Sequence, residues 1–280
     1  MAVKIKKPTT PGQRGMIVTD YSGLDKKKPE KSLSGILRRN KGRSHGKITV
    51  RHKGGGSKRK FRDIDFKQNQ MGDTLTVMAL EYDPNRSAFI ALARNQDGKK
   101  RYILAHSKMK TGDEVKISES ASIKDGNRML LVNIPIGTLV HNIEIKAGRG
   151  GQLARSAGSQ AKVLAHDAGQ TQLVMPSSEV RTVPSQALAT VGVVSNASYR
   201  EEVVGKAGRN RLRGKRPHVR GSAMNPVDHP HGGGEGRAPI GLKYPKTPWG
   251  KNAYGVKTRK RTKYSNISII KRRKKKKKKR

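Results

Sequence analysis

The chain has 280 residues, with 62 Lys and Arg against 20 Asp and Glu and a formal net charge of +42. A charge of this size predicts a densely charged polyanion as the partner, and nucleic acid is the first candidate. An anionic membrane would attract the same charge. However, no long apolar segment is evident and no apolar stretch follows the charged start, so we expect a soluble, unsecreted protein without a membrane partner. The absence of Cys excludes disulfides and thiolate zinc sites.

The positive charge is concentrated in two arms. Residues 1–62 hold 19 Lys and Arg against three acidic residues, and residues 205–280 hold 26 against two. Residues 63–204 carry the remaining 17 basic and 15 acidic side chains and most of the apolar runs. This pattern predicts a folded centre between a basic N-terminal extension and a basic C-terminal extension. The centre is long enough for one ordinary domain or two small ones.

The N-terminal arm shows one candidate strand, Ile48 to Val50, beside the glycines 54–56 and dense cations. Residues 205–221 have the same character without a strand, and neither stretch could bury enough apolar surface to fold alone. One interpretation is an extended peptide that is threaded between RNA helices and neutralises their phosphates. The alternative is a generic, histone-like polyanion binder. Composition alone leaves the two about even.

Residues 63–125 predict an OB-like RNA-binding barrel. Runs of β-branched and apolar residues indicate strands at 74–82, 88–93, 101–106 and 114–118. The connections Asp83-Pro84-Asn85 and Gln96-Asp97-Gly98 have residues typical of tight turns, so the first three runs read as an antiparallel meander. Closure into a small barrel would remove exposed sheet edges.

Residues 126–204 predict a second small barrel. Its candidate strands are 129–132, 137–145, 161–167, 170–175, 179–183 and 189–195. The stretch 146–160, KAGRGGQLARSAGSQ, is too rich in Gly and Ser for a buried strand and too basic for a passive spacer. We expect this loop to contact phosphate.

The segment from Met224 to Arg237, MNPVDHPHGGGEGR, predicts a shaped loop. Its two prolines restrict the backbone, whereas three consecutive glycines allow close approach to an anion. Two histidines beside an acid could form half a metal site or an acid/base pair. We favour a backbone-shaped loop whose imidazoles bind phosphate or ribose. The closing run 271–280, KRRKKKKKKR, predicts a tail that is disordered when free, or a solvated or nuclear-localisation-like run.

Several long phrases resemble the bacterial type of the large-subunit ribosomal protein of the L-two family. They are MAVKIKKPTTPGQR, RNKGRSHGKITVRHKGGG, LVHNIE, KAGRGGQLARSAGS and GRNRLRGKRPHVRGSAMNPVDHPHGGGEGR. The resemblance implies a mostly β fold in which an OB-fold barrel is followed by an SH3-like barrel, with extended basic N- and C-terminal arms. The segments would be 1–62, 63–125, 126–204 and 205–280. The closing lysine run is longer and purer than the basic end of the family.

The resemblance also implies a function. The protein would be a structural constituent of the large ribosomal subunit and a primary ribosomal RNA-binding protein, located in the cytoplasm within the ribosome. It would support subunit assembly, association of the two subunits, tRNA placement and peptidyl transfer. Catalysis would belong to the RNA, with no cofactor of the protein's own, although magnesium could accompany the RNA. Its partners would be large-subunit ribosomal RNA, neighbouring ribosomal proteins and the small subunit, without a small-molecule substrate.

The candidate site residues form two groups. Arg86 in DPNRSA and Arg155 in GGQLARSAG match two settings in which arginines of the family are implicated in ribosomal RNA binding. The other candidate RNA-binding cations are Arg149, Arg51, Lys53, Lys58, Arg59, Arg62, Arg209, Arg211, Arg213, Arg216, Arg220 and Arg237. A loop near the peptidyl-transferase region would contain Asn225, Asp228, His229, His231, Gly232, Gly233 and Gly234. Within it, the resemblance implies that His229 is a structural contributor and not a general base.

Two other hypotheses belong to different classes. A metal-assisted hydrolase would be centred on Asp228, His229 and His231, and stoichiometric metal in chelator-washed protein would support it. A chromatin-like packaging protein would bind duplex DNA and ribosomal RNA with equal affinity. Packaging does not require the specific motif at Met224–Arg237, so this hypothesis ranks behind the ribosomal one.

Overall fold

The computed structural model describes residues 3–26, 28–37 and 42–273, and most of its regular structure is β-strand. The chain divides into two compact units. The main unit comprises Met1–Arg38, Lys58–Lys206 and Ile267–Arg280, and the small unit comprises Arg39–Ser57 and Ala207–Asn266. Within the described ranges, no helix has the length and apolar character that crossing a membrane requires.

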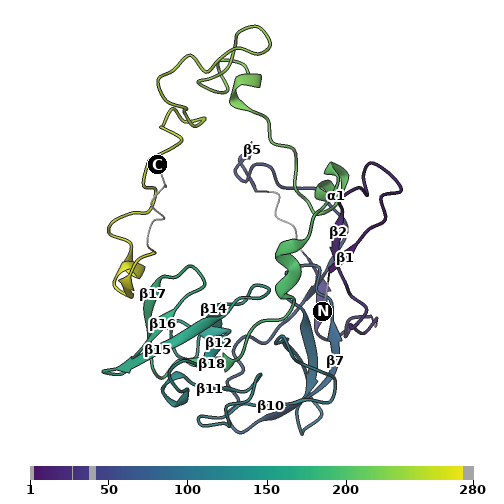
Figure 1. Cartoon of the computed structure of the whole chain (residues 1–280), viewed down its shortest axis with the longest axis vertical. Coiled ribbons are helices and arrows are strands. Elements are labelled where there is room, and N and C mark those ends of the chain that lie inside the picture. Colours follow the sequence, from purple (N-terminus) through teal and green to yellow (C-terminus); the bar gives the residue numbers. More distant parts are fainter. Residues whose placement is uncertain (1–2, 27, 38–41, 274–280) are drawn as a thin grey trace. The chain divides into compact units, whose positions relative to one another are not determined.

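The first sheet of the main unit has four antiparallel strands in the order β10-β7-β8-β9 (Figure 1). They are β7 (Thr74–Glu81), β8 (Ile90–Arg94), β9 (Lys100–Leu104) and β10 (Glu114–Lys116). Alternate side chains such as Leu75 and Val77 point into a core with Phe89 and Ile103. The predicted meander and fourth strand are confirmed. They were predictable because the alternation of apolar residues and the turn residues specify the register of this sheet locally.

The second sheet of the main unit has seven strands in the order β11-β18-β12-β15-β16-β17-β19 (Figure 1). They are β11 (Arg128–Leu130), β12 (Leu139–His141), β15 (Ala161–Asp167), β16 (Gln170–Val174), β17 (Val180–Pro184), β18 (Leu188–Val191) and β19 (Ile269–Lys271). Its core includes Met129, Val140, Val163 and Leu173. The run predicted at 129–132 ends early, since Leu131–Asn133 form a 3₁₀ turn.

Short strand pairs complete the main unit. The elements are β1 (Val3–Ile5) with β2 (Ile17–Thr19), β3 (Ser34–Ile36) with β6 (Lys60–Arg62), β13 (Ile143–Glu144) with β14 (Gly151–Leu153), and the 3₁₀ turn Ala197–Glu201. The stretch 146–160, expected to be too rich in Gly and Ser for a buried strand, does contain the short strand β14, of which the first residue, Gly151, is buried. Because β13 supplies the hydrogen bonds, a sequence poor in apolar residues can still form this strand.

The basic arms contain structure that the sequence did not predict. In the N-terminal arm, Met16, Thr19 and Leu24 are buried, and Leu24 packs in the core of the first sheet. In the C-terminal arm, β19 pairs with β17. The C-terminal arm forms this strand by pairing with the folded centre, and its own apolar content would not be sufficient.

The small unit is built from turns and short elements. They are β4 (Arg43–Ser44), β5 (Lys47–Ile48), the helix α1 (Ala207–Leu212) and the 3₁₀ turns Gly221–Ala223 and Tyr264–Asn266. The strand predicted at Ile48 to Val50 instead ends at Ile48. Helix α1 buries none of its residues, so packing of an apolar face does not explain its stability.

The predicted fold class is confirmed: the protein is mostly β, with two sheets consistent with an OB-fold followed by an SH3-like module. The segment boundaries at 62, 125 and 204 stay predictions. Most of the predicted polylysine tail, residues 274–280, lies outside the described residues.

Candidate nucleic-acid interface

Arg86 and Arg155, which are far apart in the sequence, share one aromatic ring in the main unit. The guanidinium carbon of Arg155 lies 4.3 Å from the ring centroid of Phe66, and that of Arg86 lies 5.3 Å from the same centroid. Both distances are within the range of cation–π attraction. Phe66 therefore gathers the two arginines that the sequence singled out, and sequence reasoning missed Phe66 itself.

A buried acid holds Arg86 in place. The Asp83 side chain is fully buried, and its Oδ2 accepts a hydrogen bond from Arg86 Nε at 2.6 Å. Asp83 Oδ1 also accepts from the backbone N–H of Asn85 at 2.9 Å. From outside the turn, Arg59 Nη1 donates to the carbonyl oxygen of Pro84 at 2.8 Å. The turn after β7 is thus a fixed support for Arg86.

Arg155 is less neutralised than Arg86. Its Nη1 donates to the carbonyl oxygen of Gly151 at 3.0 Å, and no described acidic side chain forms an ion pair with it. Partial removal of its guanidinium from water lowers the pKa of Arg155, and the nearby charge of Arg86 lowers it further. A polyanion placed here would relieve the repulsion between the two guanidinium groups.

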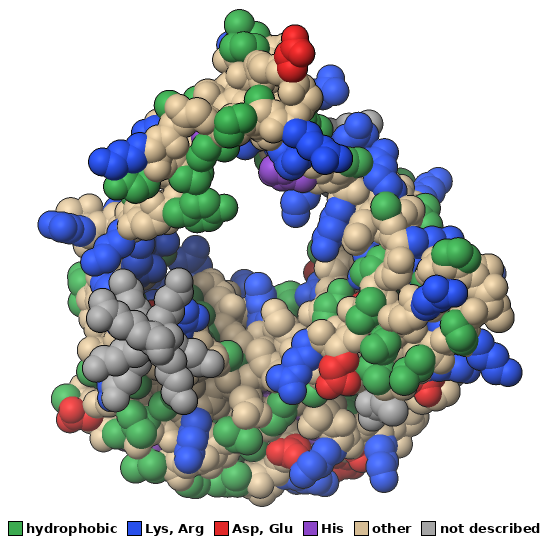
Figure 2. Space-filling view, turned by 45° about the horizontal axis from the view of Figure 1, so that its top comes forward, with side chains coloured by type: hydrophobic (Ala, Val, Ile, Leu, Met, Phe, Trp, Pro, Cys, Tyr) green, Lys and Arg blue, Asp and Glu red, His purple; other side chains and the backbone are tan. Residues whose placement is uncertain are grey.

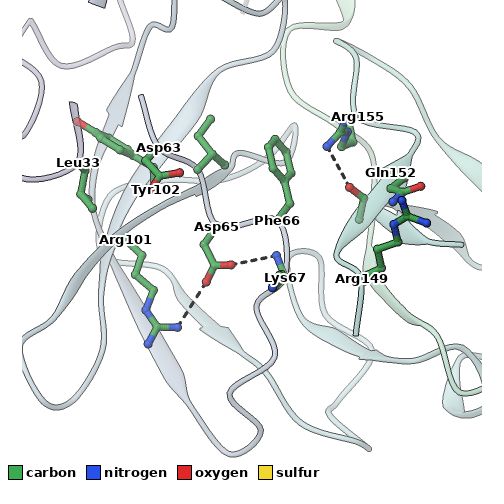
Figure 3. A pocket seen from close by; sticks show the side chains of 12 residues that line it. Leu33, Asp63, Asp65, Phe66, Lys67, Arg101, Tyr102, Arg149, Gln152 and Arg155 are labelled. Carbon is green, nitrogen blue, oxygen red and sulfur yellow. Dashed lines mark hydrogen bonds and ion pairs between the residues drawn. The ribbon is translucent and has the colours of Figure 1, made fainter. Parts of the chain in front are cut away.

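A pocket of about 780 Å³ lies beside Phe66 in the main unit (Figure 3). Its lining combines the rings of Phe66 and Tyr102, the cations Lys67, Arg101, Arg149 and Arg155, the acids Asp63 and Asp65, and Leu33, Ile64, Gly151 and Gln152. Arg101 is paired with Asp65 at 3.5 Å, whereas Arg149 and Arg155 come from the opposite wall, around β14 (Figure 3). Tyr102 is fully buried, so the half-buried Phe66 ring is the aromatic surface that, beside these cations, suits a base with its phosphate.

A buried ion pair supports the β14 wall. Arg128 Nη2 lies 3.1 Å from Glu144 Oε1, and both side chains are fully buried. Arg128 also donates to the carbonyl oxygens of Lys67 at 3.2 Å and Asn142 at 2.8 Å. Burial lowers the pKa of Arg128 to about 10, while Glu144 opposes that shift, so the guanidinium remains charged at neutral pH.

Glu144 extends this support to the basic loop. Its carboxylate accepts hydrogen bonds from the backbone N–H groups of Gly148 and Gly150, each at 3.0 Å. These bonds fix the backbone on both sides of Arg149. Sequence reasoning missed Arg128 and Glu144, although a charged residue in or beside an apolar run was the available signal, since such residues are rarely buried unpaired.

In the small unit, backbone hydrogen bonds shape the predicted loop. The carbonyl oxygen of Asn225 accepts from the N–H groups of Asp228 at 3.0 Å and His229 at 3.2 Å. Gly232 N donates to His229 O at 2.8 Å, and Gly233 N donates to Met224 O at 3.0 Å. A Cβ at position 232 would collide with the backbone of Asn225. These contacts agree with the prediction of a shaped loop.

The two imidazoles of this loop accept backbone hydrogen bonds. His229 is buried, and its Nδ1 accepts from His231 N at 3.0 Å. His231 Nε2 in turn accepts from Lys246 N at 2.8 Å. Desolvation lowers the pKa of His229, and His231 and Arg51 lower it further. Among the described residues, no group of three or more His, Asp or Glu could hold a metal ion.

The other candidate cations are dispersed over both units. The main unit carries Lys58, Arg59, Arg62 and Arg149, and the small unit carries Arg51, Lys53, Arg209, Arg211, Arg213, Arg216, Arg220 and Arg237. On the face shown in Figure 2, Lys and Arg side chains stand out in many places and acidic side chains are few. The structure brings Arg86, Arg149 and Arg155 near one pocket. The contacts of all these candidate cations with RNA stay predictions.

Two β-sheet modules with a cationic and aromatic surface define a polyanion-binding protein of the RNA-binding class. Residues 30–117 match the family model of the Ribosomal Proteins L2, RNA binding N-terminal domain, and residues 124–250 match that of the Ribosomal Proteins L2, C-terminal domain. The chain belongs to the L2 family of ribosomal proteins, as its sequence motifs indicated. It is a large-subunit ribosomal protein that binds RNA, with ribosomal RNA and ribosomal proteins as partners and not a classical enzyme. Its place is the ribosome, which is cytoplasmic in bacteria.

Proposed function

We propose that the protein is a primary ribosomal RNA-binding protein that supports large-subunit assembly, association with the small subunit, tRNA placement and peptidyl transfer by the RNA. The convergence of Arg86 and Arg155 on Phe66 beside a cationic pocket is the observation that supports this proposal best. The protein needs no cofactor of its own in this role, and any magnesium belongs to the RNA. Neither a small-molecule substrate nor a catalytic residue is part of the proposal.

Replacing either Arg86 or Arg155 by Ala weakens binding to purified large-subunit RNA by about 1–3 kcal/mol, since each change removes charged hydrogen bonds to phosphate. Filter binding at several salt concentrations measures the effect. Each lost phosphate contact should also reduce the log–log salt slope by about 0.7 to 0.9.

Arg94→Ala is the matched control, because it removes the same charge from an exposed position at the end of β8. It should change RNA affinity much less than the Arg86 and Arg155 variants do. Equal losses for all three would mean a generic polyanion binder, and equal affinity of the unaltered protein for duplex DNA would favour a packaging protein.

The proposed contribution to peptidyl transfer centres on His229 as a shaping residue. Large subunits reconstituted with His229→Ala should assemble but transfer peptide roughly 5–10-fold more slowly. This factor corresponds to the free energy of about one hydrogen bond. The loss arises because His231 N no longer has its acceptor. Sucrose-gradient sedimentation checks assembly, and a single-turnover peptidyl-transfer assay measures the rate.

His229→Asn separates shaping from acid–base chemistry. Its side-chain oxygen can accept from His231 N but cannot act as a base near neutral pH. Rates close to those of unaltered particles are expected for this variant, and Val227→Ala, at a residue 92% exposed, serves as the loop control. An Asn variant as slow as the Ala variant would argue against the shaping role.

A further inference from the structure

Trp249, the single Trp of the chain, is displayed on a tight turn of the small unit. Thr247 N donates to Lys251 O at 2.7 Å, and Gly250 N donates to Thr247 O at 2.9 Å. Lys246 Nζ closes the base of the turn on Asn252 Oδ1 at 2.7 Å. Trp249 is 73% exposed although the residues on both sides of it are hydrogen-bonded, so the turn holds a large apolar ring in water.

Two contacts fix this turn within the small unit. The backbone N–H of Lys246 donates to His231 Nε2, which ties the turn to the histidine loop. The guanidinium carbon of Arg51 lies 5.0 Å from the centroid of the Trp249 ring. The cation accounts for one side of the indole, and most of the ring surface remains open.

The surroundings indicate what could cover the open ring. Residues 238–263 contain eight Lys and Arg and no Asp or Glu. This charge favours an anionic partner, and the exposed indole favours a partner that has a flat aromatic face of its own. An RNA base with its phosphate supplies both, because every base has a face for stacking and the cations can pair with the backbone.

We propose that Trp249 is a stacking platform for an unpaired RNA base, with Arg51 on the other side of the indole. An unpaired base is required because the bases inside a helix already stack on their neighbours. The inference rests on the proposed RNA-binding function and adds a second kind of contact to it. The turn and the His231 contact pre-organise the ring, which reduces the entropy lost on binding.

The single Trp makes the test direct. The full-length protein is titrated with purified large-subunit RNA while Trp emission and its quenching by acrylamide are recorded. Stacking should quench the emission and protect the indole from acrylamide. In filter binding, Trp249→Ala should lose affinity by a factor of roughly 5 to 150, the range for one base stacked on an aromatic ring, whereas Trp249→Phe should retain most of it.

The control is Tyr264→Ala, which removes another exposed ring, 81% accessible, from the same unit; its affinity should change little. RNA binding with unchanged Trp emission would overturn the stacking inference and leave the proposed function intact. Protection of the indole only in assembled subunits would also overturn it, in favour of an apolar protein surface. Failure of the unaltered protein to bind the RNA at all would refute the proposed function, and the stacking inference with it.

Discussion

Glu144→Ala should lower the free energy of unfolding of the main unit by about 3–5 kcal/mol, the usual cost of leaving one buried charge without its partner. The Arg128 guanidinium, fully buried, would keep only neutral acceptors such as the Asn142 carbonyl and the Thr190 hydroxyl. The N–H groups of Gly148 and Gly150 would lose their acceptor as well. Denaturant unfolding followed by circular dichroism measures the change.

Glu30→Ala is the matched control, because it removes an ion pair of similar length from a partly exposed site. Glu30 Oε2 lies 2.7 Å from Lys100 Nζ, with side chains 26% and 42% accessible. Exposed pairs contribute little, so this variant should lose no more than about 1 kcal/mol. Similar losses for the two variants would contradict the special role of the buried pair.

The buried His141 should make the main unit less stable in acid. Its Nδ1–H donates to the Gly192 carbonyl at 3.0 Å, and burial lowers its pKa from 6.5 to about 4. Between these two pH values the imidazole binds a proton in the unfolded chain but not in the folded chain. The contribution of neutral His141 to the free energy of unfolding is therefore complete above pH 6.5 and is lost as the pH falls to 4. The shift corresponds to about 3 kcal/mol.

Denaturant unfolding at a series of pH values tests this dependence. His141→Gln should show a curve that is flatter by about that amount between pH 6.5 and 4. His106, whose pKa burial also lowers, contributes to the slope that both proteins share. His45→Gln, which removes an exposed imidazole, should keep the full slope. Parallel curves for the unaltered protein and His141→Gln would show that His141 does not carry the acid sensitivity.

The strands of the centre were predictable because their signals are local. Alternating apolar residues at 74–82 and turn residues at 83–85 specify a hairpin from within one stretch of chain. The short strands β14 and β19 lack such a signal, since each is stabilised by backbone hydrogen bonds to a partner strand. Register with a partner cannot be read from a two- or three-residue segment.

The candidate site was predictable in part. Resemblance singled out Arg86 and Arg155, and composition predicted a polyanion partner, but neither indicated that both guanidinium groups lie over Phe66. Nor did the sequence reveal that Glu144 fixes the loop around Arg149. The contacts with Phe66 join residues that are far apart in the sequence, and the Glu144 contacts depend on the backbone path of the β13–β14 hairpin.

By itself, the sequence determined the class of partner from its net charge, the mostly β fold from its periodicity and the family from its long motifs. These three properties belong to the chain and do not depend on its tertiary structure. Only the tertiary structure decided which cations lie together and which acids are buried to hold them. A flexible guanidinium or carboxylate acquires a fixed direction when side chains and carbonyl groups from other strands restrict it, and folding alone brings those groups within hydrogen-bond distance.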